Sequence, residues 1–110
     1  MKDGFIKVAA ATPQIEVADC IHNTQEIIKK AKEMSAAGAR ILVFPELCIT
    51  GYTCHDLFFN ETLLQSAEQQ LLVLAEELKG TEGLIFVGLP LEYSGKLYNT
   101  AAAVNRGEIL

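Results

Sequence analysis

The fold of this chain is decided by residues 41–52, which read ILVFPELCITGY. The first four residues are apolar without a polar break, a pattern typical of a parallel-sheet strand that is buried on both faces. Pro45 has no backbone N–H to donate, so the strand is expected to end there, and an acid, Glu46, follows at once. Open α/β sheets bind ligands at the carboxyl ends of their strands, which makes Glu46 a candidate site residue.

Two interpretations of Glu46 are open at this point. The loop after it stays apolar, with Leu47, Ile49 and Tyr52, and a carboxylate in apolar surroundings is suited to proton transfer near neutral pH. The alternative is structural, because an acid in this position could also cap a helix or form a salt bridge at the surface.

Strands and helices alternate along the rest of the chain. The patterns predict strands over 5–14, 40–44, 84–89 and 97–104, helices over 19–37 and 61–79, and turns at 94–96 and 105–107. We expect Asp19 or Asn23 to cap the first helix and Asn60 the second, with Gly38 and Gly80 ending them. The first strand, helix and next strand form a βαβ unit, which implies a right-handed crossover between parallel strands.

The composition limits the classes of function. The chain has 110 residues, of which 50% are hydrophobic, and a net charge of −5 without a basic run, which argues against binding nucleic acid. No apolar stretch approaches the roughly 20 residues that span a bilayer. We expect no signal peptide from the start of the sequence, and three cysteines without a Cys-x-x-Cys pair indicate reduced thiols, so we expect a cytoplasmic protein.

The polar residues around Glu46 offer a second kind of site. Cys54 and His55 are adjacent, so their side chains need not converge with Cys48 on one point. A metal site would have to be assembled from Glu46, Cys48, Cys54, His55 and Asp56. That set lacks the paired short spacing of structural zinc sites, and buried cysteine is the commoner case, so we expect no metal.

Two motifs carry a resemblance to a known family. Residues 43–47 (VFPEL) with 51–52 (GY) resemble the glutamate motif of the nitrilase (carbon–nitrogen hydrolase) superfamily. The continuation over 53–59 (TCHDLFF) resembles the amino-terminal glutaminase domain of glutamine-dependent NAD synthetases. The likeness runs along the whole chain, including the strand at 7–14, the helix end at 37–39 and the residues LYNTA at 97–101.

The resemblance implies an α/β fold that is part of a nitrilase-type four-layer αββα sandwich. Residues 1–110 would be the amino-terminal portion of the hydrolase domain, since residues 108–110 begin a strand without finishing it. The superfamily uses a Glu-Lys-Cys triad, of which only Glu46, the general base, has a match here. The family's lysine would follow Leu110, and Lys96 does not match it.

The resemblance also implies an activity. Glutamine would be hydrolysed, with Tyr52 helping to line the pocket, although Tyr52 could equally be a core tyrosine. The ammonia would amidate deamido-NAD in a separate synthetase domain that uses ATP and Mg²⁺, and the family tends to form homo-oligomers. Two alternatives remain: another superfamily amidohydrolase acting on a small amide or carbamoyl compound, or a non-enzymatic α/β interaction module without a pocket at Glu46.

Overall fold

The computed structural model describes residues 6–51 and 61–110. In this part of the chain, five strands form one mixed sheet in the order β1-β2-β3-β4-β5, and two helices accompany it. The strands are β1 (Val8–Ala10), β2 (Ile41–Val43), β3 (Leu84–Tyr93), β4 (Lys96–Asn105) and β5 (Glu108–Ile109). The helices are α1 (Cys20–Ala36) and α2 (Glu61–Glu77).

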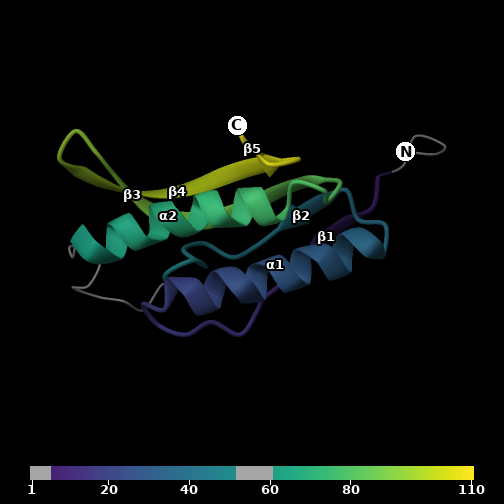
Figure 1. The fold of residues 1–110 in the computed structure, drawn as a ribbon, viewed down its shortest axis with the longest axis horizontal. Helices are drawn as coiled ribbons and strands as arrows, with labels where there is room; N and C mark the ends of the chain where they lie inside the picture. The colour runs from purple at the N-terminus through teal and green to yellow at the C-terminus, as the bar shows by residue number, and fades with distance from the viewer. Residues whose placement is uncertain (1–5, 52–60) are drawn as a thin grey trace.

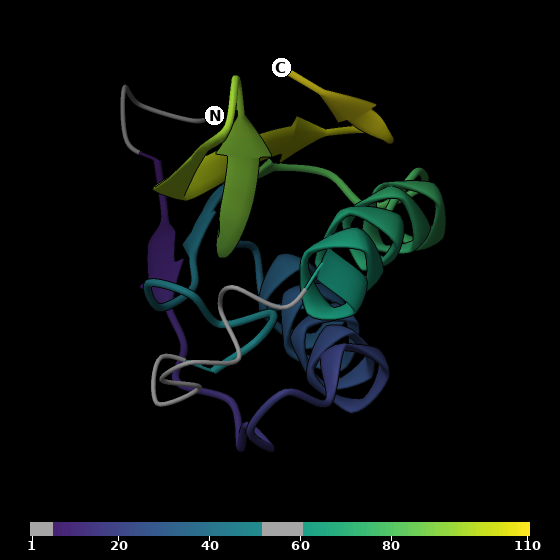
Figure 2. The ribbon, with the colours of Figure 1, turned by 90° about the vertical axis from the view of Figure 1, so that its left-hand side faces the viewer.

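The pairing follows from the connections. β1, β2 and β3 are parallel, and the helices α1 and α2 link them, as a βαβ arrangement requires. β3, β4 and β5 are antiparallel and are joined by tight turns. Figure 1 shows the two helices side by side, and the end view in Figure 2 shows them on one side of the sheet. The predicted parallel βαβ unit is confirmed.

The ends of α1 follow the predicted signals in part. Asp19 caps the helix by accepting a hydrogen bond from the backbone N–H of His22 at 3.0 Å. Gly38, at φ +99°, ends it in the left-handed conformation that glycine adopts without a steric penalty. Asn23 is not the cap, because its side chain is fully buried and bonds elsewhere.

One face of the sheet is packed against the helices. Paired residues on neighbouring strands share a face, so Leu42, Ile85 and Val104 point the same way and are all buried. Ile27 of α1 and Leu74 of α2 are fully buried in the same cluster. This cluster is the hydrophobic core of the described residues.

The opposite face of the sheet, which we call the open face, is apolar, and neither described helix covers it. It carries Val8, Val43, Phe86, Ala101 and Ala103, as the register shows. Val8 is 64% exposed and Val43 is 43% exposed. Strand 41–44 is therefore buried on one face within the described residues, and the expectation of burial on both faces is not met there.

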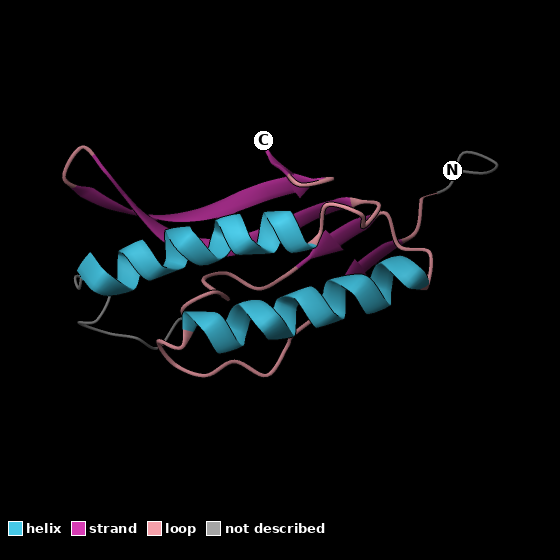
Figure 3. Ribbon diagram, viewed as in Figure 1, coloured by secondary structure: helices cyan, strands magenta, loops and turns pink. Residues whose placement is uncertain are grey.

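The strands differ in length from the prediction. β1 covers only three of the residues predicted over 5–14, because the chain leaves the sheet after Ala11, whose N–H donates to Val43 O at 3.1 Å. β3 continues past Leu89 through Pro90 to Tyr93. Pro90 has no N–H to donate, and it is tolerated because β2 has already ended and no strand pairs with β3 on that side. The long β3–β4 hairpin consequently extends past the ends of β1 and β2 (Figure 3).

Candidate functional site

Glu46 lies in a tight turn that follows β2. The N–H of Cys48 donates to Pro45 O at 3.3 Å, and Leu47, the third residue of this turn, has a positive φ of 55°. A non-glycine residue in that conformation costs on the order of 1 kcal/mol, so other contacts must hold the turn in place. Glu46 therefore follows a strand as predicted, in a turn of fixed shape.

The turn is held against the middle of β3 at Gly88. Ile49 N–H donates to Gly88 O at 3.1 Å, and Gly88 N–H donates to Cys48 Sγ at 3.4 Å. These bonds satisfy the backbone of β3 beyond the point where β2 stops pairing with it. A Cβ atom at Gly88 would lie 2.3 Å from Leu47 N, so only glycine permits this close approach.

Cys48 is a structural thiol in this arrangement. It is buried, and burial raises the pKa of the Cys48 thiol to about 11. The hydrogen bond with the Gly88 backbone acts in the opposite direction and offsets only part of this rise. The thiol is therefore protonated at neutral pH and is not activated as a nucleophile. This agrees with the resemblance, which gave Cys48 no catalytic role.

Asn23 of α1 fixes the other end of the turn. Its side chain accepts from Glu16 N–H at 2.7 Å and donates to Glu16 O at 2.8 Å and to Ile49 O at 2.9 Å. Nearby, Ala18 N–H donates to Thr50 O at 2.8 Å. The residues after Glu46 are thus bound to β3 on one side and to the start of α1 on the other.

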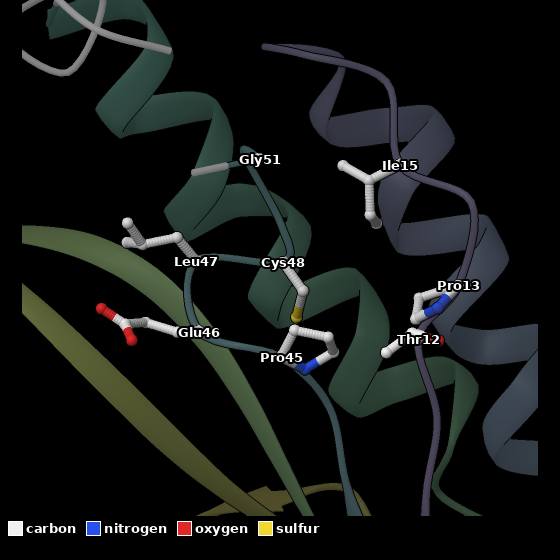
Figure 4. Close-up of a pocket in the computed structure, with 8 residues that line it drawn as sticks. All are labelled: Thr12, Pro13, Ile15, Pro45, Glu46, Leu47, Cys48 and Gly51. Carbon is white, nitrogen blue, oxygen red and sulfur yellow. The ribbon is translucent and has the colours of Figure 1, made fainter. Parts of the chain in front are cut away.

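The Glu46 side chain points toward the β3–β4 hairpin, away from Pro13 and Ile15 (Figure 4). Its carboxylate is exposed, and Oε1 accepts a hydrogen bond from Nδ2 of Asn99 on β4. The expected apolar enclosure of Glu46 is not present among the described residues. Neither structural alternative holds there either, since no described cation pairs with Glu46 and it caps neither α1 nor any described helix end.

Two cavities meet at Glu46. One, of about 410 Å³, lies on the open face and is lined by β2, the turn and the hairpin, including Val43, Phe86, Asn99 and Thr100. The other, of about 330 Å³, lies between the turn and Thr12–Ile15 and is lined mostly by apolar atoms (Figure 4). The carboxylate points toward the first cavity, which Asn99 also lines.

Several predicted site residues lie outside the described residues. Tyr52, predicted to line the pocket, is one of them, and its role stays a prediction; Cys54, His55 and Asp56, for which we expected no metal site, also lie outside the described residues. Within residues 6–51 and 61–110, no group of three or more His, Cys, Asp or Glu side chains could hold a metal ion. No helix in the described ranges is long and apolar enough to cross a membrane.

The carbon-nitrogen hydrolase family model matches residues 7–110. The chain belongs to the carbon-nitrogen hydrolase family. A glutamine-dependent NAD(+) synthetase from Mycobacterium bovis is 35% identical over 97% of this chain, and one from Aquifex aeolicus is 30% identical over 96%. The chain spans 16% and 18% of the lengths of these two relatives.

Solved structures agree with this placement. A glutamine-dependent NAD(+) synthetase from Cytophaga hutchinsonii superposes with a TM-score of 0.88 and 31% identity, over 94% of this chain and 18% of that one. An amidase from Nesterenkonia sp. gives a TM-score of 0.79 at 23% identity over 100% of this chain and 42% of that one, which supports the fold alone. The α/β fold predicted as part of a nitrilase-type sandwich is confirmed.

Three residues that shape the site were missed in the sequence. Gly88 is not indicated as a site residue by the sequence, and Asn23 was expected only as a possible helix cap. Asn99, which the sequence places in the motif at 97–101 without a role, contacts the Glu46 side chain. A glycine or asparagine inside an apolar strand or helix is the available signal, but the sequence does not say which partner it meets.

Proposed function

We propose that this chain forms the amino-terminal part of the glutaminase domain of a glutamine-dependent NAD synthetase. The observation that carries the proposal is the placement of Glu46, on a turn bound from both sides, with its carboxylate at the wall of a cavity of about 410 Å³. A non-enzymatic interaction module predicts no pocket at Glu46, so this cavity argues against it. The likeness to NAD synthetases over 97% of the chain supports the choice within the family.

Glu46 is the general base in the proposed reaction. It takes the proton of a nucleophilic cysteine as the sulfur attacks the amide carbon of glutamine, and it passes that proton to the leaving ammonia. Water then hydrolyses the thioester, so that glutamine and water give glutamate and ammonia. The nucleophile and the oxyanion-stabilising lysine come from residues beyond those of this chain. The exposed carboxylate is open to receive them on the open face.

The rest of the proposal concerns the full-length protein. Ammonia passes to a synthetase domain that amidates deamido-NAD with ATP and Mg²⁺, and no residue of this chain takes part in that step. Tyr52 lines the glutamine pocket beside Glu46. The full-length protein assembles as a homo-oligomer.

The test replaces Glu46 by glutamine in the full-length protein, which preserves the shape and removes the basic oxygen. Loss of an acid–base group typically costs on the order of 10²–10⁴ in rate, so ammonia release from glutamine should fall by that factor. NAD formation from free ammonium should persist because it bypasses the first site. Glu92→Gln, an exposed glutamate on β3, is the matched control and should keep both activities.

Equal loss of the glutamine-dependent and ammonium-dependent activities in Glu46→Gln would contradict the proposal, and so would near-normal glutamine hydrolysis. If the full-length protein hydrolyses a small amide or carbamoyl compound and forms no NAD from either nitrogen source, it is another amidohydrolase of the family. The assay therefore separates the two enzymatic alternatives.

A further inference from the structure

The geometry points to Asn99 as a positioning residue that orients the Glu46 carboxylate. This inference rests on the proposed function of Glu46 and adds a residue from a different part of the chain. The two residues are 53 positions apart in the sequence. The side chain of Asn99 reaches Glu46 because the β3–β4 hairpin lies next to the turn.

Asn99 is held in place by the sheet. It pairs with Pro90 of β3 in the register of the hairpin, and its neighbour Thr100 donates through Oγ1 to Leu89 O at 2.8 Å. The register places Asn99 on the open face, together with Ala101 and Ala103. The small neighbouring alanines leave room for the cavity that Asn99 and Glu46 both line.

The contact has a direction that suits a general base. Nδ2 of Asn99 is a donor and Oε1 of Glu46 an acceptor, so the amide fixes the orientation of the carboxylate. With Oε1 occupied, Oε2 is the oxygen that would accept the thiol proton. Among the described residues, Asn99 is the only side chain that hydrogen-bonds Glu46, and no described lysine or arginine forms an ion pair with it.

The geometry of the turn makes this contact specific. Gly88 lies on β3 opposite Ala101 of β4, so the bonds that hold the turn are made beside the strand residues that carry Asn99. The turn that carries Glu46 and the strand that carries Asn99 are therefore both bound to β3. A shift of either element would separate the carboxylate from the amide.

The test measures the pH dependence of kcat/KM for glutamine in the full-length protein, with ammonium-dependent NAD formation as a check of folding. Asn99→Asp places a second carboxylate against Glu46, and two such groups compete for one proton. The acid limb of the profile should move to higher pH by about one unit or more, with activity partly recovered at alkaline pH.

Asn99→Leu removes the donor while keeping the approximate volume of the side chain. Loss of a hydrogen bond to a charged group predicts a fall in kcat/KM of about tenfold or more. Asn105→Asp is the matched control, since it introduces the same charge on the same strand and face and should leave the profile unchanged.

The outcomes are distinguishable. If Glu46→Gln abolishes glutamine hydrolysis while Asn99→Asp and Asn99→Leu both give the wild-type profile and rate, this inference is wrong and the proposed function stands. If Glu46→Gln is active, the proposed function itself fails. An Asn99→Asp protein that loses ammonium-dependent activity is misfolded, and Asn99→Leu then decides: a normal profile and rate overturns the inference.

Discussion

The two faces of the sheet differ in what they are built from and in what they carry. The covered face holds large aliphatic side chains such as Leu42 and Ile85, which the helices bury completely. The open face carries exposed valines, Phe86 and several small residues, and it includes Asn99 and Gly88, beside which the Glu46 turn is bound. One face thus supplies the stability of the fold, and the other supplies the surface on which the candidate site is built.

The turn at 45–51 connects these two roles. The turn begins after the end of β2, places Cys48 and Ile49 in the core, and presents Glu46 on the other side. The strained φ of Leu47 is maintained by these buried neighbours. The turn that carries the exposed candidate residue Glu46 is in this way anchored by buried neighbours.

The largest expected effect on stability is a cavity in the covered face. Leu42→Ala should lower the free energy of unfolding of the 110-residue chain by about 2–5 kcal/mol, because Leu42 is fully buried. Val43→Ala, one residue along on the open face, should cost less than about 1 kcal/mol. Urea unfolding of both variants checks the contrast, and equal losses would show that the faces do not differ.

A smaller effect is expected where the turn meets β3. Gly88→Ala should cost about 1–3 kcal/mol, because the new methyl group overlaps the backbone of Leu47 and Glu46 and must displace the turn. Gly80→Ala is the matched control, since a Cβ there meets nothing within 4 Å. Urea midpoints of the two variants measure the difference, and a neutral Gly88→Ala would refute the close packing of turn and strand.

The last comparison is between two adjacent residues of α1, Asn23 and Thr24, which are both polar and fully buried. Asn23→Ala should lower stability by about 1–3 kcal/mol, because it leaves the backbone groups of Glu16 and Ile49 unsatisfied. Thr24→Val should be neutral or slightly stabilising, since Thr24 Oγ1 is buried with no hydrogen-bond partner among the described residues. Thermal unfolding of the pair tests this, and a stable Asn23→Ala would remove Asn23 as an anchor of the turn.

Local patterns in the sequence predicted the elements well, but they did not predict the contacts between them. The signals at Asp19 and Gly38 placed the ends of the first helix, and the unbroken apolar run placed β2 and put Glu46 after it. The continuation of β3 through Pro90 was missed, because it depends on β2 having ended beside it. The Asn99–Glu46 contact was missed for the same reason, since it depends on hairpin register and on the approach of the turn at Gly88.

The central claim is that Glu46 serves the reaction while the covered face serves the fold. The direct measurement is the ratio of glutamine-dependent to ammonium-dependent NAD formation in the full-length protein, compared between Glu46→Gln and Leu42→Ala. The account predicts that this ratio falls by on the order of 10²–10⁴ in Glu46→Gln and stays near the wild-type value in Leu42→Ala, where both activities decline together. An unchanged ratio in Glu46→Gln would contradict it.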